Sequence, residues 1–328
     1  MSITTIDRVL NGRDKVRAST AQRVLDAAER IGFYAEGAIR ARIESAKPVS
    51  NLGILLQYRH SLFIKNLAHQ LRSAAAAYEK STISITIEYA DDLAPEAVAA
   101  QISALGRTSD VIGVMTARHS LISRAIEEQR ERGVPTFGMI SEITADCSVG
   151  YIGVDNWKVG RTAAWAFSNI CRKPGKIGII VGNHRYRSHE LNEMGFRSYF
   201  RDHSSDLHII DPVSTWGDEA KAEALTCEMI EREPDLVALY VSGGGIKGAL
   251  AGLRKTQRGA RLVTLGYQLT EETRAALADG TLDVVIAHPV KSLAKETMIA
   301  MVGAIGRDPE FTLPTVSLPL EIYTPENI

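Results

Sequence analysis

The sequence lacks the features that mark an exported, membrane-spanning or metal-binding protein. No stretch reaches the roughly eighteen apolar residues of a membrane-spanning helix, and the N-terminus has no apolar signal region. Cysteine is scarce: Cys147, Cys171 and Cys227 lie too far apart for a metal site, and no Cys-x-x-Cys occurs. An odd number of cysteines without an export signal favours reduced thiols, so we expect a cytoplasmic protein with no membrane or metal partner.

Signals of catalysis are missing as well. The sequence has no Gly-x-Ser-x-Gly elbow and no carboxylate pair that stands out from ordinary surface charge. The run Ser242-Gly243-Gly244-Gly245 has the glycines of a phosphate loop, but the Lys-Ser/Thr pair of such loops does not follow it. We therefore expect that the protein is not an enzyme and that it uses no cofactor.

The composition is that of an ordinary globular protein, with 45% apolar and 23% charged residues among 328 and a net charge of −1. A chain of this length accommodates about two or three domains. The charge is uneven, because residues 1–47 carry nine lysines and arginines against six acidic residues, and the remainder carries 29 against 33. A basic head before an acidic body is typical of a small phosphate-contacting module joined to a ligand-sensing body.

The first thirty-four residues predict a helix, a short polar loop and a second helix. The first helix is expected to start after Ser2, a good N-cap, and to end at Asn11-Gly12. The second is expected from about residue 19 to residue 31, before Gly32. Apolar residues recur at helical spacing in both: Ile6, Val9, Leu10, Val24, Leu25, Ala28 and Ile31. This is part of a helix-turn-helix domain, without the helix that normally precedes the reading helix.

The run from Ser2 to Tyr34, with Arg8-Val9-Leu10-Asn11-Gly12 and Ala28-Glu29-Arg30-Ile31-Gly32-Phe33-Tyr34, resembles the lactose/galactose repressor (LacI-type) family of transcriptional regulators. Members of that family usually carry about fifteen further residues in front, which hold the first helix and the turn. Met1 stands where the family commonly has valine. We therefore expect that Met1 is a misplaced start and that the natural chain begins upstream; a deliberately shortened chain is the alternative.

The resemblance implies a set of DNA-contacting residues: Ser2, Ile3, Thr4, Thr5, Arg8, Asn11 and, further along, Ile43. Arg8 could donate two hydrogen bonds to guanine, a contact worth roughly 1–3 kcal/mol of discrimination, or it could be a solvated surface arginine. Thr4 could offer its hydroxyl or methyl group to a base. Asp7 replaces the family's usual serine and would repel phosphate unless a basic neighbour pairs with it.

Residues 35–49 are polar and bounded by Pro48, and by themselves they fit a flexible linker. The resemblance implies instead a hinge helix that forms on DNA and places an apolar residue, here Ile43, in the minor groove. Two departures from the family pattern weaken the expected DNA affinity of this segment. Glu36-Gly37 replaces the usual Pro-Asn, and Glu44 replaces an arginine.

From about residue 50 the sequence alternates apolar strands with helices, which predicts an α/β fold with two doubly wound parallel-sheet lobes. We assign residues 1–34 to the partial helix-turn-helix, 35–49 to the hinge or linker, and 50–328 to a ligand-binding, regulatory domain. In that domain we expect a first lobe of residues 50–149 and 284–312, a second lobe of 150–283, and a C-terminal strand over 313–328. Strand Val284–Ala287 and a helix over 292–305 would thus cross back to the first lobe.

The body also resembles the LacI-type family and, more distantly, periplasmic sugar-binding proteins of type I. The motifs are Val154-Asp155-Asn156 with Gly160, then Gly195-Phe196, then Gly266-Tyr267 with the run from Glu272 to Gly280. Together with the head, the resemblance covers nearly the whole chain, from Ser2 to about Tyr323.

The resemblance and the rule that ligands bind at the carboxyl ends of parallel strands indicate the ligand-binding residues. They are His60, Phe63, Asp155, Tyr186, Ser188, Asn192, Trp216, Gly243, Gln268 and His288. Asn192 stands where the family often has an arginine, which favours an uncharged sugar or polyol over an anion. Trp216 could stack on a sugar ring, for about 1 kcal/mol, or could be a partly buried core residue. Asp155 could bind hydroxyls or cap the next helix, and His288 could bind the ligand or lie in the core.

We therefore interpret the chain as a transcriptional regulator, a repressor of sugar-uptake or catabolic genes that binds a near-palindromic operator as a homodimer. A small neutral sugar or polyol in the cleft would change operator affinity through its different affinity for two conformations. The alternative is a sugar- or solute-binding protein that no longer binds DNA.

Overall fold

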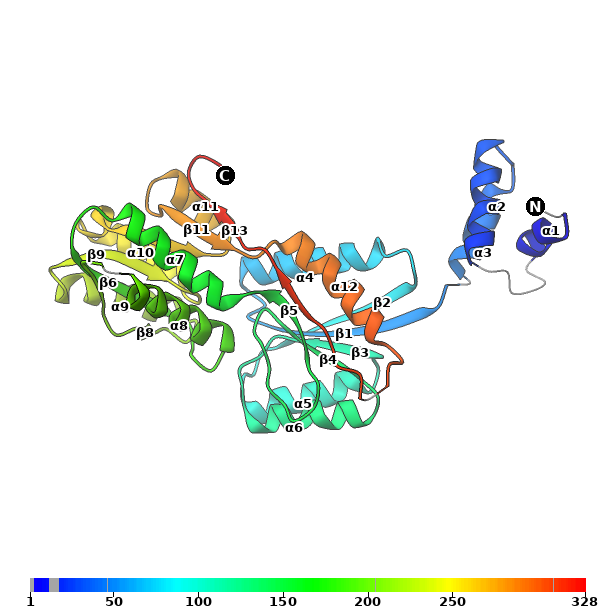
Figure 1. The fold of residues 1–328 in the computed structure, drawn as a ribbon, viewed down its shortest axis with the longest axis horizontal. Coiled ribbons are helices and arrows are strands. Elements are labelled where there is room, and N and C mark those ends of the chain that lie inside the picture. Colours follow the sequence, from blue (N-terminus) through cyan, green and yellow to red (C-terminus); the bar gives the residue numbers. More distant parts are fainter. Residues whose placement is uncertain (1–2, 12–17, 46, 204, 309) are drawn as a thin grey trace. The chain divides into compact units, whose positions relative to one another are not determined.

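The computed structural model describes the chain except residues 1–2, 12–17, 46, 204 and 309 (Figure 1). The chain divides into two units, one of residues 1–50 with 75–84 and the other of residues 51–74 with 85–328. Across the part that the structure describes, no helix is both long and apolar enough to cross a lipid bilayer.

The N-terminal helices share a small apolar core. Helix α1 covers Ile3–Asn11, α2 covers Ala18–Arg30 and α3 covers Glu36–Ser45. Their buried side chains are Val9, Val24, Leu25, Ala28 and Ile39, with Phe33 and Ile43 partly buried against them. Gly32, at φ +61°, follows α2 and permits the left-handed turn expected there. The segment that the sequence left open between a linker and a hinge helix is helical over residues 36–45, and Ile39 ties it to this core.

The first lobe is built on a sheet in the order β12-β5-β4-β3-β1-β2. Its strands are β1 (Val49–Gln57), β2 (Thr82–Ala90), β3 (Val111–Val114), β4 (Thr136–Met139), β5 (Gly150–Val154) and β12 (Thr315–Leu318). Its helices are α4 (Leu62–Ala76), α5 (Pro95–Gly106), α6 (Ser120–Glu131) and α12 (Val290–Ala304). Helices α5 and α6 cover one face of the sheet, and α4 and α12 cover the other (Figure 1). Helices on both faces explain why the inner strands β3, β4 and β5 are buried along their whole length.

The second lobe repeats the plan with a sheet in the order β13-β11-β10-β9-β6-β7, to which β8 adds beside β6. Its strands are β6 (Gly175–Val181), β7 (Leu207–Ile209), β8 (Val213–Ser214), β9 (Leu236–Val241), β10 (Val263–Tyr267), β11 (Val284–Ala287) and β13 (Glu321–Tyr323). Its helices are α7 (Asn156–Ile170), α8 (Arg187–Asp202), α9 (Glu219–Arg232), α10 (Ile246–Lys255) and α11 (Glu271–Ala278), with a short 3-10 turn over Gly259–Arg261. One core packs α7 and α8 on the sheet around Phe196, and a second packs α9, α10 and α11 on the opposite face around Leu250.

The structure corrects two expectations for the C-terminal part. Strand β11, expected in the first lobe, pairs with β10 and β13 in the sheet of the second lobe. Helix α12 does lie in the first lobe, where it contacts β3, β5 and β12. The segment 313–328 forms two strands rather than one, because β12 joins the first sheet and β13 the second. A four-residue apolar strand fits either sheet, so the local sequence of β11 does not decide its partner.

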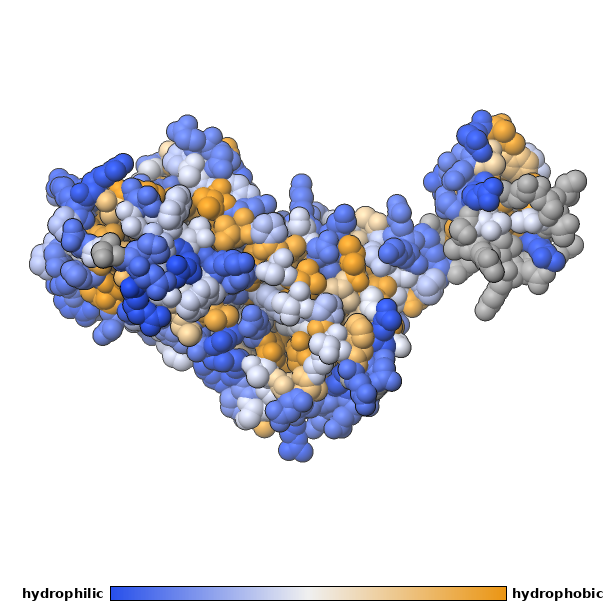
Figure 2. Space-filling view, in the orientation of Figure 1, coloured by the Kyte–Doolittle hydropathy of each residue, from blue (hydrophilic) through white to orange (hydrophobic). Residues whose placement is uncertain are grey.

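The chain changes lobe where β5 leads into α7, where β11 leads into α12 and where β12 leads into β13. Asp155 and His288 stand in the first two of these crossings. On the face drawn in Figure 2, hydrophilic residues dominate and hydrophobic ones lie in small patches, as expected for lobes whose sheets are covered by helices.

Candidate ligand-binding site

The carboxyl ends of the strands carry strained residues. Among the described residues other than glycine, φ is positive at Tyr58, Ile140, Trp216 and Gln268, with values from +55° to +71°. Each stands within two residues of the end of a strand, namely β1, β4, β8 and β10 in that order. A positive φ outside glycine costs of order 1–3 kcal/mol and is concentrated at ligand sites. The strain therefore marks the sheet edges at which folds of this kind bind ligands.

Polar contacts join the two lobes beside these strand ends. The hydroxyl of Tyr186 donates to Gln57 Oε1 and lies 3.2 Å from the hydroxyl of Tyr58. The backbone nitrogen of Ser188 donates to Ser141 Oγ at 3.2 Å. Burial raises the pKa of both phenols, so each keeps its proton at neutral pH and can serve as a donor. Tyr186 and Ser188, both expected to face the ligand, thus connect the lobes.

A buried cluster stands at the crossing from β11 to α12. We call it the hinge cluster; it consists of Phe63, Tyr267, Gln268 and His288. His288 is 1% exposed, and its Nδ1 lies 2.5 Å from Gln268 Nε2. Its backbone nitrogen donates to Gln268 Oε1 at 3.2 Å, which fixes the orientation of that amide. The rings of Phe63 and Tyr267 lie 5.9 Å and 5.7 Å from the imidazole, measured between ring centres.

The hinge cluster also fixes the proton of His288. Burial lowers the pKa of this imidazole to about 3, so the ring is neutral at pH 7. The amide nitrogen of Gln268 can only donate, so Nδ1 accepts and the ring proton stands on Nε2. Within the described part of the chain this buried Nε2 has no hydrogen-bond partner. A buried unpaired donor costs about 1–3 kcal/mol, and a ligand hydroxyl would satisfy it.

A pocket of about 370 Å³ lies between Arg118, from the first lobe, and the loop that follows β6 in the second. We call it the cationic pocket; it is lined by Arg118, Asn183, His184, Arg185, Ser214 and Trp216. Trp216 is 56% exposed, so the alternative that it is a core residue is wrong and its ring is open to a ligand. The volume falls within the range of about 300–1,000 Å³ that small-molecule sites usually have.

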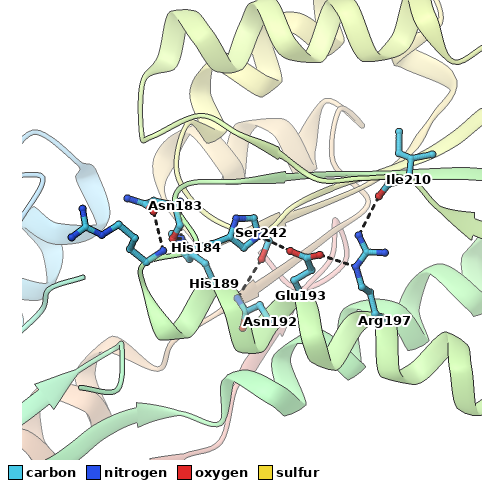
Figure 3. A network of polar contacts seen from close by, with 9 residues as sticks. Asn183, His184, His189, Asn192, Glu193, Arg197, Ile210 and Ser242 are labelled. Carbon is cyan, nitrogen blue, oxygen red and sulfur yellow. Dashed lines mark hydrogen bonds and ion pairs between the residues drawn. The ribbon is translucent and has the colours of Figure 1, made fainter. Parts of the chain in front are cut away.

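Polar contacts hold the loop after β6 in place (Figure 3). His184 Nε2 lies 2.5 Å from Glu193 Oε2, and Arg197 Nε donates to Glu193 Oε1 at 2.7 Å. The backbone nitrogen and carbonyl oxygen of Asn183 lie 3.1 Å and 3.0 Å from His189 Nδ1. Burial lowers the pKa of His189 to about 4, so this imidazole is neutral as well. The loop is therefore anchored on α8 before any ligand binds.

Of three other expected ligand residues, two have structural contacts and one is exposed. Asn192 is fully buried, and its amide nitrogen is 3.4 Å from Ser242 Oγ. Turned by 180°, the same amide would donate to the carbonyl oxygens of Asn156 and Ser188 at 2.9 Å and 3.2 Å. Asp155 caps α7 by accepting from the backbone nitrogen of Lys158 at 3.1 Å. Of the two roles expected for this residue, hydroxyl binding and helix capping, the structure shows the second. His60 is exposed on the loop after β1.

Gly243 follows β9 at φ +139°, a conformation that other residues rarely adopt. A Cβ added there would approach His189 Nε2 to 2.8 Å. A side chain at this position would need both a strained backbone and a displaced imidazole. Gly243 therefore makes room for His189.

Sequence reasoning missed Arg118 and Ser214, whereas the run 182–189, which contributes Asn183, His184 and Arg185 to the cationic pocket, was expected to face the cleft. The signal for Arg118 was present, because it follows β3 as the run 183–185 follows β6, both at carboxyl ends of strands. Among the described residues, no group of three or more His, Cys, Asp or Glu side chains could hold a metal ion.

The residues expected to contact DNA belong to the N-terminal helices. Ser2 lies outside the described residues, as do the side chains of Ile3, Thr4 and Asn11. Arg8 is exposed on α1, and Thr5 on the same helix is half-buried. Ile43 is partly buried against the core of the N-terminal helices, so it would have to leave that core to enter a minor groove.

Comparison with known proteins bears out the expected fold. A family model described as a periplasmic binding protein domain matches residues 52–307. GanP, a glucose-galactose binding protein from Geobacillus stearothermophilus, has a TM-score of 0.76 at 14% identity, over 86% of this chain and 99% of that chain. A solute-binding protein from Actinobacillus succinogenes with bound D-allose has 0.74 at 15% identity, over 85% and 98%. One from Bacillus halodurans with bound myo-inositol has 0.73 at 16%, over 86% and 96%. The α/β fold of periplasmic-binding-protein type is thus confirmed.

One curated relative is similar to part of the chain. Catabolite control protein A from Priestia megaterium is 26% identical over 135 residues, which are 41% of this chain and 39% of the relative. The match thus spans about two fifths of the length of that relative.

Proposed function

Because the chain belongs to the periplasmic binding protein domain family over residues 52–307, we propose that it binds a sugar-like ligand and regulates transcription in response to it. In this proposal the N-terminal helices contact operator DNA, and ligand binding between the lobes changes operator affinity. The protein acts in the cytoplasm as a homodimeric repressor of sugar-uptake or catabolic genes, with each protomer on one half-site.

The observation that carries this proposal is the small helical core in front of the family domain. Helices α1, α2 and α3 pack around Val9, Leu25 and Ile39, whereas the family domain begins at residue 52. The three sugar- and polyol-related structures named above are covered almost completely by 85–86% of this chain, so the chain has a segment that they lack. A basic segment of this kind before a ligand-binding domain suits phosphate contact, and the part-length similarity to Catabolite control protein A agrees with it.

Helix α1 has the two faces that a DNA-reading helix needs. Val9 is 6% exposed and belongs to the helical core, whereas Arg8 beside it is exposed. An arginine on the outer face of a helix in the major groove can hold guanine O6 and N7 together, which is worth roughly 1–3 kcal/mol against other bases. Thr5, one turn before Arg8, suits a phosphate contact on the same helix.

The ligand side of the proposal uses both clusters at the strand ends. Trp216 offers an exposed ring for stacking on a sugar, and Phe63 offers a half-buried one. The Nε2–H of His288 has no protein partner among the described residues and suits a ligand hydroxyl. Because Tyr186 and Ser188 bond across the lobes, a ligand that prefers one arrangement of the lobes shifts their equilibrium by its difference in affinity.

DNA binding tests the regulatory part of the proposal. Fluorescence anisotropy with a labelled fragment of the neighbouring promoter would be measured for this chain and for a form extended by the in-frame codons upstream, at several salt concentrations. We expect specific, steeply salt-dependent binding by the extended form, because phosphate contacts release counterions. Arg8→Ala should weaken specific binding by about five- to a hundredfold and relax base preference. Arg23→Ala, which removes an exposed arginine of α2, is the matched control. Binding no stronger than to unrelated DNA in both forms would contradict the proposal.

The second candidate is a sugar-binding protein that no longer binds DNA. Its support is the charge of α3, where Arg40 pairs with Glu29 and Glu36 at 2.9 Å and 2.8 Å instead of facing phosphate. Asp7 adds a carboxylate to the reading helix. This candidate predicts that the extended form binds sugars with the same affinity in the presence and absence of the promoter fragment.

A further inference from the structure

The cationic pocket holds more positive than negative charge. Among the described residues that line it are Arg118, His184 and Arg185, and none of these lining residues is acidic. The carboxylates that lie nearby are already engaged. Glu190 Oε2 lies 2.6 Å from Arg118 Nη2 and 2.9 Å from Arg187 Nη1, so one carboxylate pairs with two guanidinium groups.

The other neighbouring carboxylates are also occupied. Glu193 accepts from Arg197 through one oxygen and faces His184 through the other. Asp218, which follows Trp216 by two residues, accepts from the backbone nitrogen of Lys221 at 2.8 Å as the cap of α9. None of these three carboxylates pairs with Arg185 in the part of the chain that the structure describes.

Arg185 contributes to the pocket a charged side chain on a backbone that is held in place. Its backbone is held on both sides, because its nitrogen donates to Asn183 Oδ1 at 2.9 Å and its carbonyl accepts from the backbone nitrogen of Arg118 at 2.9 Å. Its guanidinium has no ion-pair partner in the described part of the chain. A guanidinium that is positioned by its backbone and left unpaired at a pocket is suited to a ligand anion, to which it can donate two parallel hydrogen bonds.

We infer that the ligand of the cationic pocket is a sugar derivative with anionic oxygens, a phosphate ester or a carboxylate, and that Arg185 binds this group. The inference rests on the proposed function, which gives the site a sugar-like ligand, and it specifies the charge of that ligand. The volume of about 370 Å³ holds a monosaccharide with one such group, and Trp216 supplies the ring for its carbon face.

Asn192 does not argue against an anion. The expectation of a neutral ligand came from the absence of an arginine at this position. In the structure the Asn192 side chain is fully buried and takes its partners within the second lobe. The charge of the pocket is set instead by Arg118, from the first lobe, and by Arg185, from the loop after β6.

Calorimetry with matched ligands tests the inference. A panel of monosaccharides, each with its 6-phosphate and its aldonic acid, would be titrated into the wild-type chain, with inorganic phosphate as a separate probe. The 6-phosphate and aldonate arms distinguish a phosphate ligand from a carboxylate ligand. Each would be repeated with Arg185→Gln and with Arg201→Gln, which removes an exposed arginine on α8 away from the pocket. Thermal melts of both variants verify that they fold.

We expect an anionic member to bind more tightly than its neutral parent, and increasing salt to weaken that binding. Arg185→Gln should lower its affinity by about ten- to a hundredfold, the usual effect of losing hydrogen bonds to a charged group, and Arg201→Gln should leave it unchanged. Neutral sugars that bind at least as tightly as their anionic forms would overturn the inference. So would an absence of any response to inorganic phosphate and to the anionic panel. If neutral sugars alone bind and change operator affinity in the extended form, the proposed function stands and only the inference fails.

Discussion

The hinge cluster and the cationic pocket lie at the same kind of place, the carboxyl ends of parallel strands, yet their chemistry differs. In the hinge cluster His288 is 1% exposed and neutral, and aromatic rings surround it. In the cationic pocket Trp216 is 56% exposed, and the side chain of Arg118 is 37% exposed beside Glu190. Burial removes charge from a group that can lose its proton, whereas a guanidinium stays charged and is retained where water or a carboxylate reaches it. This difference in charge is the basis on which we proposed a ligand hydroxyl for His288 and an anion for the cationic pocket.

Acid should have the largest effect, on the hinge cluster through His288 and on the loop after β6 through His189. Burial lowers the pKa of His288 to about 3 and that of His189 to about 4, below the value of about 6.5 in an unfolded chain. The unfolded chain therefore binds more protons as the pH falls below about 6.5, and the free energy of unfolding decreases by up to about 1.4 kcal/mol per pH unit for each histidine. Urea unfolding between pH 7 and pH 4.5 measures this decline.

The substitution His288→Gln should reduce the slope of this decline by up to about 1.4 kcal/mol per pH unit, the contribution of one histidine. The reason is that glutamine takes up no proton when the chain unfolds. His60→Gln controls for the loss of an exposed histidine outside the hinge cluster. An unchanged slope in His288→Gln would contradict a neutral, buried imidazole at this position.

Removing one hydrogen-bonding partner should cost more in the hinge cluster than in the cationic pocket. Gln268→Met keeps the approximate shape of the side chain but leaves the backbone nitrogen of His288 without its Gln268 partner and His288 Nδ1 with only the hydroxyl of Tyr267, at 3.5 Å. We expect the free energy of unfolding to fall by about 1–3 kcal/mol. Arg118→Gln breaks a partly exposed ion pair with Glu190 and should cost less than about 1 kcal/mol. Urea unfolding of both variants at pH 7 measures the difference, and equal losses would remove the distinction between the regions.

The smallest effect concerns the aromatic side chains. Trp216→Ala should weaken sugar binding by about fivefold, equivalent to about 1 kcal/mol of lost stacking, while the free energy of unfolding stays nearly constant because the ring is mostly exposed. Phe63→Ala, which removes a half-buried ring from the hinge cluster, should lower both quantities. Calorimetry and urea unfolding on the same preparations separate the two effects. Loss of stability in Trp216→Ala equal to that in Phe63→Ala would show that both rings are structural.

Much of the fold could be predicted because local apolar runs are unambiguous when turns bound them. Strand β11 (Val284–Ala287) has the bounds that the sequence predicts, and helix α12 (Val290–Ala304) begins two residues before and ends one residue before the expected range of 292–305. The two-residue strand β8 was not predicted, because so short a segment carries no period. The assignment of β11 to the first lobe was wrong, since sheet membership depends on strands far away in the sequence.

The candidate site was predictable in part. Phe63 and Trp216 were identified from the resemblance, and Gln268 and His288 from their places near strand ends; the structure brings Phe63, Gln268 and His288 into one cluster. The expectation for Asn192 came from a substitution in the resembled family, and that position is fully buried here. Arg118 was missed because its approach to the loop after β6 depends on how two lobes meet, which no local pattern contains.

The sequence by itself determined the alternation of strands and helices, the uneven charge of the N-terminal segment, and the edges of the sheets at which polar residues gather. These follow from periodicity and composition, which act over a few residues. Only the tertiary structure decided that His288 is buried and bonded to Gln268 while Arg185 remains charged and unpaired within the described chain. The physical reason is that burial and charge compensation depend on neighbours brought together by folding, and those neighbours set the protonation and the binding chemistry of each side chain.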